Sequence, residues 1–363
     1  MPNRIIYRIS IAVLAIIGCF QLFTFSKKAI NFNFDNETFY AAKSHNYNFD
    51  VNFCGEKIPL GSKDILERFD KEIIKNTYWH SSILLFYKRS GKYFPIIEPI
   101  LKKHGIPNDF KYLAIAESGL KNVVSPAGAR GFWQFMEKTG LEYNLEINKE
   151  VDERYHLEKA TEAACKYFKE AYAKFNSWTL VAASYNMGMY GLQKNLTRQK
   201  TNNYFDLLLN SETSRYVFRI AAFKAILENP KHFGFNLNDS HRYAPMQFKT
   251  ITVDTSISNF TDFAINQNIN YKLLKIANPW LRNQSLKNAN SKRYLLKIPS
   301  DEYLIHSELN YTKPDSITVY ADSTLKTLCI DSLKQITTDT ISQENSINSD
   351  SLKIAPQIEK SNQ

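Results

Sequence analysis

Apolar residues at helical spacing dominate the middle of the chain. Ile65, Phe69 and Ile73 recur every four residues. Residues at such intervals lie on one face of an α-helix, which predicts an amphipathic helix packed against a core. Between residues 64 and 230 no segment shows the two-residue alternation of a strand, so we expect residues 61–235 to form one all-α domain. A second, longer apolar face consists of Ala160, Ala164, Tyr167, Phe168, Ala171 and Phe175.

Glycine and proline mark the helix boundaries that we expect in this domain. Gly91 and Pro95 are predicted to interrupt the helical pattern of residues 82–105, because proline has no backbone N–H to donate inside a helix. Pro107 precedes the next helix, and Gly119 is expected to end it.

The pattern changes after residue 245. Residues 249–255, KTITVDT, alternate like a strand, and residues 293–300, RYLLKIPS, predict a second strand. Two short helical stretches lie between them, so residues 245–302 predict a small β-α-α-β module. Residues 310–363 are rich in Ser, Thr, Asp, Asn and Gln and predict a disordered tail. The expected fold class is therefore mainly α, with a small α+β module after the helical domain.

The N-terminal residues 1–28 predict an export or anchoring segment. Arg4 and Arg8 precede an uncharged apolar run over residues 9–25, and two lysines follow it. The run is at the lower length limit of a membrane-spanning helix, and Cys19 follows residues that resemble a bacterial lipobox. An uncleaved helix and a lipidated Cys19 therefore both stay open. Either places the rest of the chain, after a spacer over residues 29–60, in an extracytoplasmic space.

Charge and cysteine content narrow the expected partners. Residues 301–363 contain ten acidic and five basic residues, so the first 300 hold 41 basic and 26 acidic residues, a net charge of +15. A basic folded part suits an anionic polymer or a membrane surface, and export argues against nucleic acid. Cys54, Cys165 and Cys329 show neither CxxC spacing nor a histidine partner, so we expect no metal, cofactor or disulfide framework, and Cys165 is expected in the core.

Glu117 is the strongest candidate for a catalytic residue. It follows the apolar run of residues 112–116, and Leu113 and Ala114 share its helical face. A desolvated carboxyl keeps its proton to higher pH and can act as a general acid, whereas most glutamates are simply surface residues. The acids from Glu137 to Glu150 lie in polar surroundings, so no second carboxylate of this kind follows. This favours a one-carboxylate mechanism in which the substrate supplies the nucleophile, in contrast to two-carboxylate glycosidases.

Three sequence blocks, in this order along the chain, resemble the motifs of a known family. Residues 114–136 are AIAESGLKNVVSPAGARGFWQFM, residues 182–188 are AASYNMG, and residues 212–217 are ETSRYV. Together they resemble the signature blocks of lytic murein transglycosylases with a goose-type-lysozyme-like (SLT) catalytic domain, of the membrane-bound D type. The resemblance implies cleavage of the bond between N-acetylmuramic acid and N-acetylglucosamine in peptidoglycan. Glu117 would act first as acid and then as base, giving a 1,6-anhydro product.

The resemblance also implies residues around the substrate. Ser125 would line the sugar site, although a turn-forming role is the alternative. Trp133 would either stack on a sugar or fill the core. Glu212 would have a structural or positioning role and not transfer a proton. The substrate-binding residues implied in this way are Ser118, Ser125, Gln134, Met136, Tyr185, Asn186, Glu212 and Tyr216.

The module at 245–302 resembles the LysM-like unit that follows such catalytic domains, chiefly at Asn278 and Pro279. It lacks the usual Gly-Asp-Thr opening, so glycan binding and simple bracing of the catalytic domain both stay open. The expected partners are peptidoglycan glycan strands and the membrane, and the sequence does not identify a partner among cell-wall enzymes. A lysozyme-type hydrolase and a non-catalytic wall-binding protein are the rival interpretations.

Overall fold

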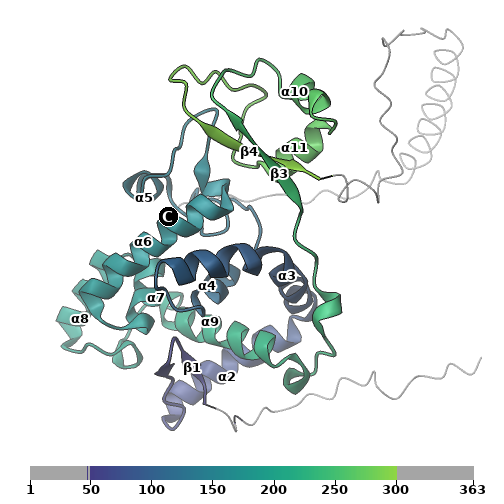
Figure 1. The fold of residues 1–363 in the computed structure, drawn as a ribbon. Coiled ribbons are helices and arrows are strands. Elements are labelled where there is room, and N and C mark those ends of the chain that lie inside the picture. Colours follow the sequence, from purple (N-terminus) through teal and green to yellow (C-terminus); the bar gives the residue numbers. More distant parts are fainter. Residues whose placement is uncertain (1–46, 48–49, 301–363) are drawn as a thin grey trace, which may run out of the picture. The chain divides into compact units, whose positions relative to one another are not determined.

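A computed structural model describes Tyr47 and residues 50–300 of the chain (Figure 1). The predicted N-terminal anchor with Cys19 and the predicted C-terminal tail lie outside the described residues. Within those described, no helix has both the length and the apolar character needed to cross a membrane. The described part divides into two compact units, with the boundary between Pro245 and Met246.

The first unit is built from helices, as the apolar periodicity predicts. Helix α9 packs against α2, α4 and α7, and α6 packs against α3 and α7 (Figure 1). The α-helices are α2 (Lys63–Tyr78), α3 (His80–Lys103), α4 (Phe110–Ser118), α5 (Glu137–Glu142), α6 (Leu157–Phe175), α7 (Trp178–Met187), α8 (Met189–Gln199) and α9 (Thr213–Glu228). Short 3₁₀ turns are η1 (Glu153–Tyr155), η2 (Tyr204–Asp206), η3 (Pro230–Phe233) and η4 (Asp239–His241).

Helix α3 runs without a break through Gly91, Pro95 and Pro99, so the predicted interruption is wrong. Both prolines lie on the exposed side of the helix, where water can satisfy the carbonyls that proline leaves unpaired. Gly91 has a packing role instead, since a Cβ there would lie 2.5 Å from the Cβ of Arg242.

A short hairpin precedes the helices. Strands β1 (Asn52–Phe53) and β2 (Glu56–Lys57) pair antiparallel, and Phe53 is fully buried in the core of the first unit. The Glu56 carboxylate accepts hydrogen bonds from the backbone N–H groups of Trp178 and Thr179 at the start of α7. Negative charge at a helix N-terminus is stabilising. The end of the predicted spacer over residues 29–60 therefore belongs to the helical unit.

The second unit has the predicted β-α-α-β order, which confirms the expected fold class. Strands β3 (Phe248–Val253) and β4 (Tyr294–Pro299) pair antiparallel, with Phe248 opposite Pro299 and Val253 opposite Tyr294. Helices α10 (Phe260–Asn266) and α11 (Tyr271–Ala277) lie between them in sequence. The buried Asn278 joins α11 to β4, because its amide exchanges hydrogen bonds with the backbone N–H and C=O of Lys297.

Candidate active site

Helix α4 places Glu117 at the wall of a cavity. Leu113 and Ala114 are fully buried one turn earlier, while Glu117 is half-buried in the last turn. Gly119 ends the helix in the left-handed conformation, with φ of 60°. A Cβ at Gly119 would also lie 2.7 Å from the Phe86 ring. Glycine is therefore needed here both for the turn and for the close approach of α3.

The surroundings of Glu117 adjust its acidity in opposite directions. Burial raises the pKa of the Glu117 carboxyl to about 7. A hydrogen bond from the Tyr216 hydroxyl to Oε1 and the positive charge of Arg219 both act to lower that pKa, and the charge of Glu212 raises it. A carboxyl balanced in this way is divided between its acid and base forms near neutral pH, which suits proton transfer in both directions.

Helix α7 brings Tyr185 and Asn186 toward the start of α9. Burial, followed by the charge of Glu117, raises the pKa of the Tyr185 phenol well above its ordinary value. The Tyr185 hydroxyl donates to the carbonyl oxygen of Trp133 at 2.7 Å. The Thr213 hydroxyl donates to Asn186 Oδ1 at 2.7 Å, and Asn186 Nδ2 donates to Glu212 Oε1 at 3.4 Å. Glu117, Tyr185 and Tyr216 thus form one cluster, and Asn186 ties α7 to α9 beside it.

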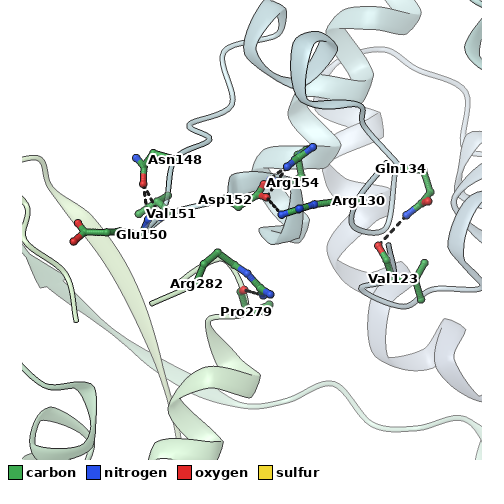
Figure 2. Close-up of polar contacts among 10 residues, drawn as sticks. All are labelled: Val123, Arg130, Gln134, Asn148, Glu150, Val151, Asp152, Arg154, Pro279 and Arg282. Atoms are coloured by element: carbon green, nitrogen blue, oxygen red, sulfur yellow. Dashed lines mark hydrogen bonds and ion pairs between the residues drawn. The ribbon is translucent and has the colours of Figure 1, made fainter. Parts of the chain in front are cut away.

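Residues 119–156 connect α4 to α6 and include the short helix α5; we call them the loop between α4 and α6. Polar groups within this loop bond to one another (Figure 2). Gln134 Nε2 donates to the carbonyl oxygen of Val123 at 3.1 Å. It also donates to the carbonyl oxygen of Gly131 at 2.8 Å, and Gln134 adopts a φ of 50°. Ser125 Oγ accepts the backbone N–H of Ala129 at 3.0 Å, the geometry of a turn-forming serine. Both side chains therefore shape the loop in the structure.

A buried ion pair fixes the far part of the same loop. The Asp152 carboxylate accepts from Arg154 Nη2 at 2.7 Å and from Arg130 Nη1 at 3.2 Å (Figure 2). The side chains of Asp152 and Arg154 are 1% and 2% exposed. A Cβ at Gly131 would lie 1.9 Å from the Arg154 carbonyl oxygen, so this approach requires glycine.

The other predicted residues lie in different surroundings. Trp133 is fully buried and donates from Nε1 to Thr161 Oγ1 at 2.8 Å, which places it in the core. Met136 is exposed at the start of α5. Ser118 is buried beside Glu117, and its hydroxyl donates to the Ala114 carbonyl at 3.0 Å.

The cavity at Glu117 has a volume of about 350 Å³ and is lined by α2, α3, the end of α4 and α9. Two carboxylates line it, Glu117 and Glu72, and Glu72 forms an ion pair with Arg215 Nε at 2.5 Å. We call its five basic side chains the cationic wall. The cationic wall consists of Lys75, Arg89, Lys121, Arg215 and Arg219.

Neither Glu72 nor the cationic wall is apparent from the sequence. These residues come from helices far apart in sequence, and no short motif joins them. The four-residue spacing of Arg215 and Arg219 places them on one face of α9 and was the available signal. Among the described residues, no group of three or more His, Cys, Asp or Glu side chains is arranged to hold a metal ion.

The described helical unit thus places one desolvated acid, at the end of a helix, against a cavity. Residues 94–207 match the family described as Transglycosylase SLT domain. Residues 249–302 match the family described as Soluble lytic transglycosylase C-terminal LysM-like domain. The chain is thus similar to an SLT transglycosylase domain over residues 94–207 and to a LysM-like domain over residues 249–302.

Two curated relatives are similar to part of the chain. They are the proteins named Membrane-bound lytic murein transglycosylase D of Escherichia coli strain K12 and of Escherichia coli O6:H1. Each is 30% identical over 194 residues, which is 51% of this chain and 42% of the relative. The match thus spans less than half the length of these relatives. Glu117, Tyr185 and Asn186 lie inside the SLT match, whereas Glu212 and Tyr216 lie beyond its end.

Proposed function

We propose that the protein is a peptidoglycan lytic transglycosylase whose catalytic domain spans residues 61–235. One observation carries the proposal: the half-buried Glu117, with a pKa raised to about 7, faces a cavity within an SLT domain. The names of the relatives support murein as the substrate. The proposed bond is the β-1,4 link between N-acetylmuramic acid and N-acetylglucosamine.

In the proposed reaction Glu117 transfers a proton twice. The protonated carboxyl first donates its proton to the glycosidic oxygen as the bond from that oxygen to muramyl C1 breaks. The muramyl acetamido group stabilises the positive charge that develops at C1. The muramyl C6 hydroxyl oxygen then bonds to C1 and loses its proton to the Glu117 carboxylate. The product is a 1,6-anhydro ring, and the acid is restored without water.

The chain's own residues would support each step. The Tyr216 hydroxyl, hydrogen-bonded to Glu117 Oε1, orients the carboxyl and favours its ionised form after the first transfer. Asn186, Tyr185 and Glu212 would keep α7 and α9 in register beside the sugar. Ser118, Ser125, Gln134 and Met136 would contact the glycan. Ser125 and Gln134 also form hydrogen bonds within their own loop.

A hydrolase on the same fold is the second candidate, because Glu72 lines the same cavity as Glu117. Inverting and retaining glycosidases use a second carboxylate as base or nucleophile. The side chain of Glu72 is 1% exposed and is ion-paired with Arg215, which argues against its reaching a sugar or an attacking water. We therefore expect Glu72→Gln to leave the chemical identity of the product unchanged.

Product analysis tests the proposal. The full-length chain is incubated with peptidoglycan sacculi, and the released muropeptides are identified by mass spectrometry. We expect 1,6-anhydromuramyl ends, each lighter by one water than a reducing end. Glu117→Gln should lower release by roughly 100-fold or more, the scale of a general acid-base contribution. Glu142→Gln, an exposed carboxylate on α5, is the control and should match the parent.

Two outcomes would contradict the proposal. Reducing ends in place of anhydro ends would make the protein a hydrolase. Release that is equally fast in the parent and in Glu117→Gln would favour a non-catalytic wall-binding protein.

We also propose that the protein is anchored on the periplasmic side of the cell envelope. The basic and apolar segment over residues 1–28 and the membrane-bound relatives support this location. Metabolic labelling with a lipid distinguishes the two anchors. Label that is lost in Cys19→Ala indicates a lipidated cysteine, and membrane association without label indicates an uncleaved helix.

A further inference from the structure

The cationic wall carries more positive charge than its own neighbours neutralise. Arg215 is paired with Glu72. Within the described ranges, no carboxylate lies at ion-pair distance from Lys75, Arg89, Lys121 or Arg219. Four basic side chains therefore surround a cavity whose remaining acid, Glu117, has a raised pKa. Like charges gathered in this way repel one another unless an anion lies between them.

Arg219 provides a second, independent observation. Its guanidinium lies over the Tyr216 ring, with 5.5 Å from Cζ to the ring centroid, and its Nε is buried without a hydrogen-bond partner. A buried donor that lacks a partner costs free energy, and an incoming acceptor recovers it. Arg89 holds the carbonyl oxygen of Gly119 at 3.0 Å through one Nη, which fixes its guanidinium at the edge of the cavity.

The cationic wall lies almost entirely outside the part of the chain that matches the SLT family. Lys75 and Arg89 precede residue 94, and Arg215 and Arg219 follow residue 207. Only Lys121 lies within the match. The charge therefore comes mainly from helices outside the matched segment.

We propose that the cationic wall binds free carboxylates of the stem peptide carried by the muramyl residue beside the scissile bond. The inference rests on the proposed function and extends it to substrate selection. A muramyl residue whose glycosidic oxygen reaches Glu117 carries its peptide on the same sugar, which brings that peptide close to the cavity that Glu117 lines. Arginine forms paired hydrogen bonds with a planar carboxylate, and the exposed Lys75 and Lys121 add positive charge at the same cavity. The exposed Trp79 ring, 54% accessible, offers an apolar surface to the peptide.

A binding assay tests this selection without turnover. Glu117→Gln is introduced into the full-length chain so that the ligand is not cleaved. Calorimetry then compares three glycan fragments of equal length: one without peptide, one with stem peptides, and one with the same peptides amidated at their carboxyl groups. We expect the free carboxylates to bind about tenfold more tightly than the amidated form, the factor given by about 1.4 kcal/mol.

Surface variants identify the responsible side chains. Lys75→Gln with Lys121→Gln removes two exposed, unpaired cations and should reduce the preference for free carboxylates to about twofold or less, given tenfold per 1.4 kcal/mol. Lys71→Gln is the matched control, since Lys71 is exposed on the same helix and does not line the cavity. It should keep the full preference.

The results separate this inference from the proposed function. Equal affinity for free and amidated peptides would overturn the inference, and so would a full preference retained in the Lys75 and Lys121 double variant. A preference for free carboxylates in a parent chain that releases no anhydro ends would support the inference while removing the proposed function. Anhydro ends released by a chain without the preference would do the opposite.

Discussion

The loop between α4 and α6 and the cationic wall use polar side chains in opposite ways. In the loop, Gln134, Ser125 and Asp152 each bond to groups within the loop. In the cationic wall, Lys75 and Lys121 have no carboxylate at ion-pair distance among the described residues. Polar groups that are paired within the chain fix its shape, whereas unpaired groups around a cavity are free to bind a ligand.

The motif residues themselves differ in what they contact within the chain. Gln134 and Ser125 stand in a block that implies sugar contact, yet their hydrogen bonds hold the loop. Trp133 fills the core and does not face the cavity. The residues that we propose to recognise the stem peptide line the cavity from helices α2, α3 and α9, mostly beyond the SLT match.

The largest expected effect comes from breaking the loop's buried ion pair. Asp152→Ala leaves the cation of Arg154 buried without its partner, which should destabilise the fold by about 3–5 kcal/mol. Denaturant unfolding followed by tryptophan fluorescence measures this. Glu142→Ala, an exposed acid on α5, is the control and should change stability by about 0.5 kcal/mol or less. A loss below about 1 kcal/mol for Asp152→Ala would mean that the loop does not depend on this pair, since breaking a buried pair normally costs more.

The sequence predicts elements that depend on local periodicity. The apolar spacing of α2 and α6, the strand alternation of β3 and β4, and the stop at Gly119 are all expressed within a few consecutive residues. The apolar surroundings of Glu117 also follow from its own helix, because Leu113 and Ala114 share its face.

Features that depend on contacts across the chain could not be predicted in the same way. Gly91 marks close packing of α3 against Arg242, 151 positions later in the numbering, and not a break. The importance of the ion pair between Asp152 and Arg154 depends on its burial, which the sequence does not reveal. The same two residues on a surface would contribute little to stability. Glu72 and Arg215 lie 143 residues apart and meet only when α2 packs against α9.

The second-largest expected effect concerns the hydrogen bond from Tyr216 to Glu117. Tyr216→Phe removes the hydroxyl that donates to Glu117 Oε1 and keeps the buried ring. Because that hydrogen bond lowers the pKa of Glu117, its loss should raise the pKa above about 7. Activity needs the protonated carboxyl, so the alkaline limb of the pH profile should move to higher pH. The variant also lacks the hydroxyl that orients the Glu117 carboxyl, so the maximum rate should fall by about tenfold, which corresponds to about 1.4 kcal/mol.

The pH profile of anhydro-end release from peptide-free glycan measures both changes for Tyr216→Phe. Tyr190→Phe, an exposed tyrosine on α8, controls for loss of a hydroxyl and should leave the profile unchanged. An alkaline limb that stays in place in Tyr216→Phe would show that this hydroxyl does not set the acidity of Glu117.

The smallest effect tests whether the cationic wall also acts on the acid. The Arg219 charge lowers the pKa of Glu117, but its influence ranks below that of the Tyr216 hydrogen bond. Arg219→Gln should therefore move the alkaline limb to higher pH by less than Tyr216→Phe does, with a change in maximum rate of about threefold or less, since less than 1 kcal/mol is involved. Peptide-free glycan is the substrate to use, because it removes the carboxylates that Arg219 is proposed to bind. Lys71→Gln removes one positive charge outside the cavity and should leave the limb in place. An identical shift in both variants would assign the effect to net charge. A shift confined to Arg219→Gln would show that the Arg219 charge itself lowers the pKa of Glu117, and a carboxylate bound to Arg219 is then expected to raise that pKa.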